Sequence, residues 1–374
     1  MRFPEFSGEW KKCIIQDYGE VITGNTPPTN NAEYYNNGSY LWASPADLGT
    51  GKKINDTKTK LSESGFKKTR IIPKGSILVT CIGSTIGKMG MAVETMSSNQ
   101  QINSIIVNEK SNNDFVYYAI SRAFPRYLSE VGVQAVPILS KSNFEKLPNY
   151  TTSIEEQDKT GYFLNLLDER IATQNKIIED LKKLKSAIID YAIDSLDANF
   201  MKFGYLYETA GEGGTPTTSN ASFYDNGKIP FIKIDDLKKK YLVENNDFIT
   251  ELGLQKSSAW LVPTQSILFS NGATIGEITI TTYPVCTKQG ILGIVPKSNI
   301  DVEFLYYFMS SSYFKKAISR IVTEGTMKTA YLKDINNIRC PIPTKEKQQE
   351  IAKIPSAINS KIDFEQSILR LFYA

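Results

Sequence analysis

The sequence predicts an α+β protein with two similar mixed α/β domains that are separated by long helices. Three observations support this fold class: most of the chain is written twice, a long helical stretch separates the copies, and a second helical stretch follows the second copy. The chain has 374 residues, which is enough for two domains of ordinary size. Its 41% hydrophobic and 22% charged residues are typical of a soluble globular protein.

Two copies of one module follow each other along the chain, so an internal repeat is predicted. Residues 24–29 return as residues 213–218, and residues 85–87 return as residues 274–276, both at an offset of 189 residues. So many matches near one offset indicate a duplicated architecture. Further matched pairs are Tyr35 with Tyr224, Asp47 with Asp236, Phe115 with Phe304, Tyr118 with Tyr307 and Gln101 with Gln289.

Each module is predicted to be rich in strands that alternate with ordered turns. Gly, Asn and Pro supply turn geometry at the start of each copy, and glycine turns follow the apolar strands. The aromatic pairs near the end of each module indicate a helix with a buried side. The predicted strands are 40–43, 77–80, 101–107, 229–234, 267–270 and 291–295, and the predicted helices are 114–122 and 302–311.

Residues 154–193 are predicted to form one long helix, because Ser153 and Glu156 make a capping box and no proline interrupts the stretch. Its length is about 60 Å at 1.5 Å per residue. Apolar residues recur in a heptad-like stripe that Gln174 and Lys185 interrupt, so we expect a partner helix. The alternative is an ordinary surface helix of a single domain. The stripe consists of Leu164, Leu167, Ile171, Ile178, Leu181, Ile188 and Ala192.

The partner helix is predicted at the end of the chain, where residues 343–351 restate the start of the first helix. Ile358 and Ile362 then align with Leu167 and Ile171. Pro355 aligns with Leu164 and is expected to break or kink this second helix early, and the second helix is predicted to be the shorter one. The predicted segments are a first module at 1–152, a helix at 153–196, a second module at 197–344 and a helix at 345–374.

Several classes of chemistry are excluded or disfavoured by residue content. The chain contains no histidine, which excludes histidine-based acid–base catalysis and histidine metal ligation. The four cysteines are far apart, which disfavours a zinc site or a disulfide framework and favours the reducing cytoplasm. The sequence has no run of about 18 apolar residues, so no membrane span is predicted. The first residues do not have the pattern of a signal peptide.

The short motifs that resemble catalytic sequences are incomplete. Residues 83–88 have too few residues between the glycines for a phosphate-binding loop, and Met89 follows where Ser or Thr is required. Residues 25–28 have an extra threonine and lack the aromatic residue of an adenine methyltransferase signature. Three groups of lysines are interpreted as solvated turns rather than binding patches: Lys52-Lys53, Lys67-Lys68 and the run 238–240.

Two related modules on a helical spacer suit a ligand with two half-sites, and duplex DNA is such a ligand. Asn and Gln side chains in turns can bond to adenine, while Lys contacts phosphate; the alternative is that these amides only satisfy their own turns. The net charge of +3 is too small to predict DNA binding by itself. The candidate DNA-binding residues are Thr26, Thr85, Lys88, Asn99, Gln101, Thr215, Thr274, Lys288 and Gln289.

Three features of the sequence are shared with a known family: the start Arg2-Phe3-Pro4-Glu5-Phe6, the repeated Gly-x-Thr-Pro and Thr-Ile-Gly turns, and the Glu- and Gln-rich helix starts. With these features the chain resembles the specificity subunits of type I restriction–modification systems. It implies two target-recognition domains, each reading one half of a bipartite, asymmetric DNA sequence. It also implies that the helices pack as an antiparallel coiled coil, set the spacing between the domains and dock two modification subunits.

The resemblance further implies that the chemistry belongs to partner subunits and that this chain is not an enzyme. The modification subunits would methylate adenine N6 with S-adenosylmethionine. Restriction subunits would add ATP- and Mg-dependent translocation and cleavage. Two other functions stay open at this point: a coiled-coil interaction protein without DNA specificity, and a stand-alone DNA-modifying enzyme.

Overall fold

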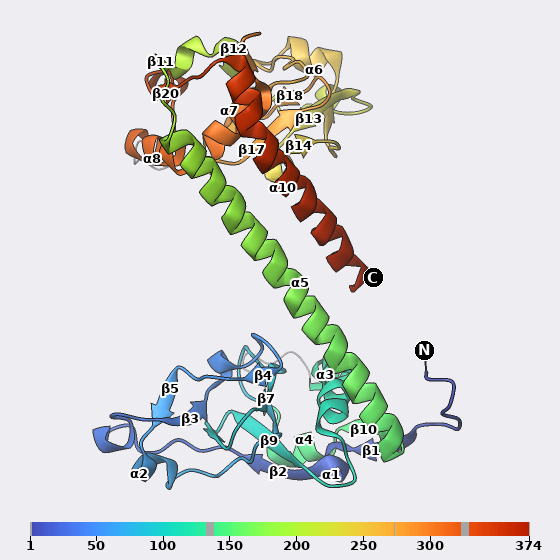
Figure 1. Cartoon of the computed structure of the whole chain (residues 1–374). Helices are drawn as coiled ribbons and strands as arrows, with labels where there is room; N and C mark the ends of the chain where they lie inside the picture. The colour runs from blue at the N-terminus through green and yellow to red at the C-terminus, as the bar shows by residue number, and fades with distance from the viewer. Residues whose placement is uncertain (1, 132–137, 273, 323–328, 374) are drawn as a thin grey trace. The chain divides into compact units, whose positions relative to one another are not determined.

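The computed structural model describes residues 2–131, 138–272, 274–322 and 329–373 (Figure 1). Ala273, part of the second predicted glycine turn, lies outside these residues. The chain divides into two compact units, Met1–Ala172 and Thr173–Ala374. The residue boundaries predicted above for the four segments stay predictions.

Unit 1 contains a five-stranded sheet in the order β2-β9-β6-β7-β4, a three-stranded sheet in the order β5-β3-β8, and the pair β1-β10. All neighbours are antiparallel except β4 with β7 and β3 with β8. The strands are β1 (Lys11–Ile14), β2 (Gly19–Thr23), β3 (Tyr40–Ala43), β4 (Lys53–Ile54), β5 (Thr59–Leu61), β6 (Ile77–Thr80), β7 (Met89–Ala92), β8 (Ser97–Ser98), β9 (Ile102–Val107) and β10 (Pro148–Thr151).

Unit 2 repeats this topology strand for strand, with sheets β12-β19-β16-β17-β14, β15-β13-β18 and β11-β20. The predicted internal repeat and the fold of two similar mixed α/β domains are therefore confirmed. The strands are β11 (Phe200–Lys202), β12 (Tyr207–Glu212), β13 (Ile229–Ile232), β14 (Tyr241–Leu242), β15 (Phe248–Ile249), β16 (Ile267–Ser270), β17 (Ile278–Thr281), β18 (Cys286–Thr287), β19 (Ile291–Pro296) and β20 (Arg339–Pro341).

Helices cover one side of each five-stranded sheet. In unit 1 the helix α3 (Asn113–Val131) buries Phe115, Ile120 and Phe124 in one cluster with sheet residues. In unit 2 two helices cover the sheet, α7 (Val302–Ser310) and α8 (Ser312–Ile321). They are separate because Ser311 interrupts the helix and caps the start of α8. The shorter helices are α1 (Ile15–Tyr18), α2 (Glu63–Phe66), α4 (Lys141–Glu145), α6 (Glu251–Gln255) and α9 (Leu332–Ile335).

The two long helices are α5 (Ile154–Asp194, 41 residues) and α10 (Lys345–Leu371, 27 residues). The prediction that Pro355 breaks the second helix early is wrong, because α10 continues through this residue. A proline inside a helix costs about 3 kcal/mol through the missing N–H and a clash with the preceding turn. Pro355 is buried, so packing against the unit 2 core offsets that cost.

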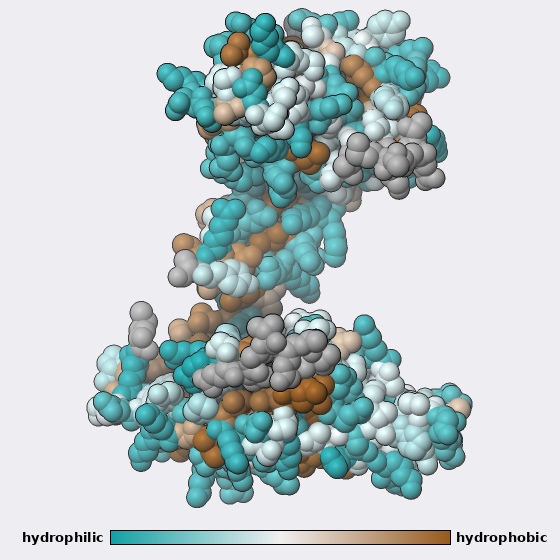
Figure 2. Space-filling model, turned by 180° about the vertical axis from the view of Figure 1, so that it is seen from behind, coloured by the Kyte–Doolittle hydropathy of each residue, from teal (hydrophilic) through white to brown (hydrophobic). Residues whose placement is uncertain are grey.

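The described part of the chain has no helix that is both long and apolar enough to cross a membrane. In the view of Figure 2, the surface of the modules is mostly hydrophilic, while brown hydrophobic atoms run along the helical part. Exposed apolar side chains on α5 include Tyr162, Leu166, Ile177, Leu184 and Tyr191. These residues have no role in the core of either unit.

Candidate nucleic-acid interface

In the first module, the turn after β2 lies against the loop between β8 and β9. The amide of Asn25 donates to the carbonyl of Ser98 at 2.8 Å. A Cβ atom on Gly24 would lie 2.3 Å from the carbonyl oxygens of Ser98 and Asn99, which no side chain can tolerate. Glycine at this position therefore lets two distant segments of the sequence form one polar loop pair.

The side chains of this loop pair bond to one another. The Thr26 hydroxyl donates to Oε1 of Gln100, which is exposed. Asn99 is 9% exposed and is used inside the loop: its Oδ1 accepts from the Gln101 amide at 3.0 Å, and its Nδ2 donates to Oε1 of Gln101 at 3.2 Å. The most accessible amide of the loop is thus Gln100, which sequence reasoning missed.

Two exposed cations border the same turn. The backbone amide of Arg70 donates to Oδ1 of Asn25 at 2.8 Å, and its Nη1 donates to the Thr23 carbonyl at 2.6 Å. Nδ2 of Asn25 donates to the Lys68 carbonyl at 2.9 Å. Sequence reasoning missed Arg70, because only the fold brings the loop before β6 to the turn after β2.

The glycine turn between β6 and β7 adjoins this loop pair. Gly83 and Gly87 have φ values of +97° and +90°, a backbone conformation that favours glycine. A Cβ on Gly83 would lie 3.6 Å from Nε2 of Gln101. Of the two candidates on this turn, Thr85 is half-buried and Lys88 is exposed. The turn therefore meets the loop pair at Gly83, whereas the Lys88 side chain lies beside Gly49.

The second module builds the same loop pair with other residues. The backbone N–H of Gln289 donates to the Thr215 hydroxyl at 3.3 Å, and the backbone N–H of Gly290 donates to Oε1 of Glu212 at 3.0 Å. Lys288, Gln289 and Thr274 are exposed. Thr26 with Gln100 and Thr215 with Gln289 thus occupy matching places.

The predicted match of Gln101 with Gln289 is wrong, and the counterpart of Gln289 is Gln100. The Asn99 amide donates to the Ala43 carbonyl, and the Lys288 amide donates to the Ile232 carbonyl, both at 2.9 Å. These two bonds align the modules at an offset of 189 through this loop. Keeping the offset of 189 found at Gly24 and Gly213 would have identified Gln100 from the sequence.

The two loop pairs differ in charge. Glu212 stands where the first module has Thr23, whose carbonyl holds Arg70. The isolated bridges place Val262 where the first module has Ile72, so Trp260 stands where the first module has Arg70. The described part of the second module therefore has no cation at that place. The first loop pair is therefore bordered by a cation and the second by a carboxylate.

A buried lysine fastens each module to its long helix. In unit 1, Nζ of Lys52 lies 2.6 Å from Asp114 on α3 and donates to Asn165 on α5 at 3.1 Å. The Lys52 side chain is 7% exposed, and its Nζ lies 4.3 Å from the ring centre of Tyr118. The interpretation of Lys52 as a residue of a solvated turn is wrong, because α3 and α5 cover it.

Unit 2 contains the matching arrangement. Nζ of Lys240, 3% exposed, lies 3.0 Å from Glu303 on α7 and donates to Ser356 on α10 at 2.9 Å. The Tyr307 ring lies 4.9 Å from Nζ. Burial lowers the pKa of Lys240, and the interpretation of Lys240 as solvated is also wrong. We call these two arrangements the lysine clasps.

The two polar residues that interrupt the predicted stripe of α5 meet polar partners on α10. Gln174 is fully buried, and its Nε2 donates to the Glu365 carbonyl at 3.1 Å. Nζ of Lys185 donates to Oδ1 of Asn359 at 2.9 Å. Higher numbers on one helix meet lower numbers on the other, so the helices are antiparallel here. Buried polar pairs of this kind fix helix register.

The apolar residues predicted for the helix pair have mixed exposure. Ile178 and Ile362 are buried at 5% exposure, and the rest are half-buried. The fully packed end of α5 instead uses Ile189 and Ile193, which join the unit 2 core. The half-buried residues are Leu164, Leu167, Ile171, Leu181, Ile188 and Ile358.

The described residues offer little for catalysis. They contain no cluster of three or more His, Cys, Asp or Glu side chains that could hold a metal ion. The four cysteines are free thiols, and burial raises the pKa of Cys81 to about 12 and that of Cys286 to about 11. The site can offer hydrogen bonds and charge, but it offers no activated nucleophile.

Fold and site together define a duplicated binding scaffold: two modules of one topology, each with an exposed polar loop pair, fastened to long helices. A family model described as the type I restriction modification DNA specificity domain matches residues 7–183 and again residues 197–370. The chain therefore belongs to this family, as the resemblance implied. The family is the specificity subunit, which is the non-catalytic component of type I complexes.

Individual relatives agree with the family match. The MjaIX specificity subunit of Methanocaldococcus jannaschii is 27% identical over 95% of this chain and 88% of the relative. The MjaVIII specificity subunit of the same organism is 24% identical over 98% and 89%. The crystal structure of a type I restriction–modification S subunit from M. genitalium superposes with a TM-score of 0.65 at 17% identity, covering 98% of this chain and 93% of that one.

Proposed function

We propose that this chain gives a type I restriction–modification complex its DNA specificity, with each module reading one half of a bipartite, asymmetric duplex target. The observation that carries this proposal is the matching loop pair in the two modules. Thr26 with Gln100 and Thr215 with Gln289 stand at the same place, yet Arg70 borders one pair and Glu212 the other. One scaffold with different loop chemistry suits two different half-sites.

The base contacts are assigned to the exposed amides. A Gln side chain can bond bidentately to adenine in the major groove, and each such pair discriminates by about 1–3 kcal/mol. Gln100 and Gln289 are both exposed. The Gln100 side chain accepts one hydrogen bond through Oε1, and Gln289 bonds to Thr215 through its backbone N–H, so both side-chain amides can turn toward a base. The proposed DNA-binding surface also includes Thr85, Thr274 and Gln101. Cations near the loops, Lys68, Arg70, Lys88 and Lys288, would contact phosphates without selecting sequence.

We further infer that the partners supply the chemistry in the cytoplasm. Modification subunits would methylate adenine N6 with S-adenosylmethionine, and restriction subunits would use ATP and Mg. Docking of modification subunits on the long helices is supported by the apolar side chains that α5 exposes, such as Ile177, Leu184 and Tyr191. The buried polar pairs of α5 with α10 and the lysine clasps would set the spacing of the half-sites.

The proposal is tested by long-read detection of N6-methyladenine in cells that carry the cognate modification subunit with or without this chain. The expected result is a bipartite, non-palindromic motif that is methylated only when the chain is present. Gln289→Ala should change one half of the motif and leave the other half as it was. A purified chain that methylates or cuts DNA unaided, or a chain that binds the modification subunit without any new methylation, would contradict the proposal.

A further inference from the structure

Unit 1 contains an apolar groove between the N-terminal segment, α3 and the start of α5. Its volume is about 770 Å³. It is lined by Phe3 and Trp10 from the N-terminal segment, by Phe115 and Tyr118 from α3, and by Phe163 from α5. The Phe3 and Phe163 rings meet edge to face at 5.8 Å. None of these residues belongs to the loop pairs, so the groove is a separate feature of the molecule.

In unit 2 the matching place is filled by the end of α5. Phe304 and Tyr307 correspond to Phe115 and Tyr118, and they share one buried cluster with Ile189 and Ile193 of α5. Asp190 of α5 accepts hydrogen bonds from the Ser312 amide and hydroxyl, both at 2.7 Å. An amphipathic helix end with an acid between two aliphatic residues therefore completes this module.

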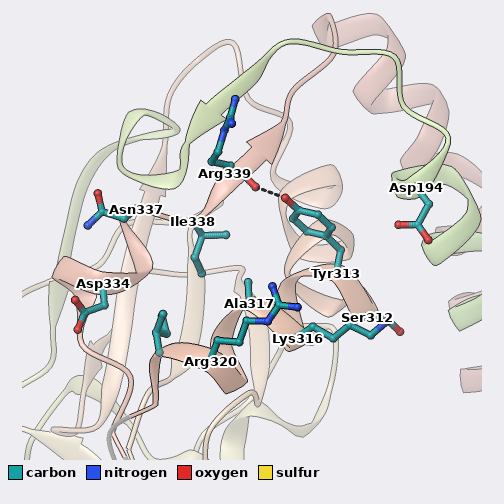
Figure 3. Close-up of a pocket in the computed structure, with 11 residues that line it drawn as sticks. Asp194, Ser312, Tyr313, Lys316, Ala317, Arg320, Asp334, Asn337, Ile338 and Arg339 are labelled. Atoms are coloured by element: carbon teal, nitrogen blue, oxygen red, sulfur yellow. Dashed lines mark hydrogen bonds between the residues drawn. The ribbon is translucent and has the colours of Figure 1, made fainter.

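Unit 2 has a pocket of about 450 Å³ beside α8, which is smaller than the groove of unit 1 (Figure 3). Asp194 from the last turn of α5 lines it together with Tyr313, Lys316 and Arg339. The Tyr313 hydroxyl donates to the Arg339 carbonyl at 2.8 Å. The large groove of unit 1 is thus the place that a helix and larger side chains fill in unit 2.

Two substitutions between the modules enlarge the groove of unit 1. Ala119 stands where unit 2 has Phe308. Phe124 packs over Gly87, and Phe314 is buried like Phe124 and lines a pocket together with Gly276, so Ala123 corresponds to Tyr313. Removing two aromatic side chains exposes apolar surface unless another group covers it. The groove therefore has room for larger apolar side chains than the end of α5 supplies to unit 2.

The polar groups of the groove specify the charge of the occupant. By the same alignment, Arg122 stands where Ser312 receives Asp190, and both Arg122 and Arg126 are exposed at the groove. Neither arginine has a carboxylate partner among the described side chains. Asn149, 5% exposed, lines the groove with its Nδ2 buried and without a hydrogen-bond acceptor. An occupant with a carboxylate and an exposed carbonyl or amide oxygen would satisfy these donors.

We propose that this groove receives an amphipathic helix of a partner subunit, whose face carries a carboxylate flanked by large apolar side chains. The carboxylate would bond to Arg122, as Asp190 bonds to Ser312 in unit 2. The helix would take the place that the end of α5 takes in the second module. This inference is independent of the DNA specificity proposed above.

The test measures binding of a helical peptide to the full chain without DNA. The probe is a fluorescein-labelled, helix-stabilised peptide with the sequence of residues 182–197, which fills the matching place in unit 2. Saturable binding is expected in fluorescence anisotropy. Arg122→Glu should weaken it at least tenfold, and a peptide with Asp190→Lys should recover affinity for the Arg122→Glu protein. Lys316→Glu, on the matching surface of unit 2, should leave binding unchanged.

A second variant keeps the test independent of the charge change. Ala119→Trp should fill the groove and abolish peptide binding while the far-UV circular dichroism spectrum is unchanged. The proposal is overturned if the peptide does not bind saturably, or if neither Arg122→Glu nor Ala119→Trp weakens it. Sedimentation of the chain alone gives the remaining outcome: self-association that Ala119→Trp abolishes would assign the groove to a second copy and overturn the partner helix.

Discussion

The two modules are alike where they hold themselves together and unlike where they meet solvent. Both use glycine to place the first turn against the loop before β9 or β19, and both bury a lysine against the aromatic residues of α3 or α7. The matching loop pairs, in contrast, carry different side chains: Arg70 borders the first pair, whereas Glu212 and Lys288 belong to the second. The comparison separates a scaffold that both copies need from loops that are free to specify different DNA.

The largest loss of stability is expected from substitutions in the lysine clasps. Replacing Lys240 with Met leaves Glu303 without its buried cation, and losing one partner of a buried pair costs about 3–5 kcal/mol. Glu303 retains 28% exposure, so we expect a loss of about 2–3 kcal/mol in the free energy of unfolding. Lys52→Met should cost less, about 1–2 kcal/mol, because the Asp114 side chain is 35% exposed.

Urea titration of both variants checks this order. Lys67→Met is the control, because its pair with Glu63 is exposed on both sides and such pairs contribute about 0–1 kcal/mol. If Lys240→Met cost no more than Lys67→Met, the clasps would not fasten the modules to the helices.

A second test uses the Glu156 carboxylate, which ties the start of α5 to Arg2 and Trp10 of the N-terminal segment. The pKa of Glu156 is lowered to about 2, mainly by hydrogen bonds from Arg2. Hydrogen bonds from Thr152 and Trp10 lower it further. Because the folded pKa lies below the ordinary value of 4.5, this carboxylate stabilises the fold above pH 4.5 and loses its effect as the pH falls toward 2. Glu156→Gln should remove about 2 kcal/mol at neutral pH.

The measurement is the free energy of unfolding between pH 7 and pH 3 for the wild type and for Glu156→Gln. The difference in stability between the two proteins should shrink as the pH falls toward 3. The exposed neighbour variant Glu155→Gln should follow the wild type. A constant difference at every pH would show that the carboxylate charge is not what stabilises the N-terminal segment.

A third test sharpens the difference between the loops. Gln100→Ala and Gln289→Ala should each lower discrimination at one base pair by about 1–3 kcal/mol, and each should affect a different half of the target. Methylation rates on duplexes with single base changes measure this effect in the assembled complex. Loss of discrimination in the same half by both variants would contradict the assignment of one half to each module.

The smallest expected effect is that of Arg70→Ala. Losing one phosphate contact should weaken DNA binding nearly equally on all sequences and lower the salt slope by about one. The control is Lys110→Ala, an exposed cation at the other end of β9. A changed half-site preference would instead mean that Arg70 contacts a base.

The sequence predicted the architecture well because repeats and helical periodicity are local patterns. The start of α5 at Ile154 follows from the predicted cap by the Ser153 hydroxyl, and its end at Asp194 lies one residue from the prediction. The second half of the predicted capping box is replaced, because the Glu156 carboxylate bonds to Arg2 and Trp10 instead. Pro355 failed as a helix breaker because burial in unit 2 offsets a local preference. Lys52 and Lys240 were misread because sequence spacing does not show which helix will cover a turn.

The loop pairs were predictable in part. Turn chemistry identified the neighbourhood of Thr26, Asn99 and Thr215, since Gly, Asn and Pro mark turns directly. The accessible amide Gln100 was missed because Gln101 was aligned with Gln289, which is an offset of 188 instead of 189. Arg70 could not be found from the sequence, because its place depends on a contact between β2 and a loop that is distant in the chain.

The most direct test of the account is a chain in which residues 197–344 are replaced by a second copy of residues 8–151, expressed with the cognate modification subunit. Long-read detection of N6-methyladenine then reads the target. Two identical modules on antiparallel helices should give a palindromic motif, in which the half-site of the first module is repeated in inverted orientation. If the hybrid chain still binds the modification subunit but the motif remains asymmetric, the two modules do not each read one half of the target.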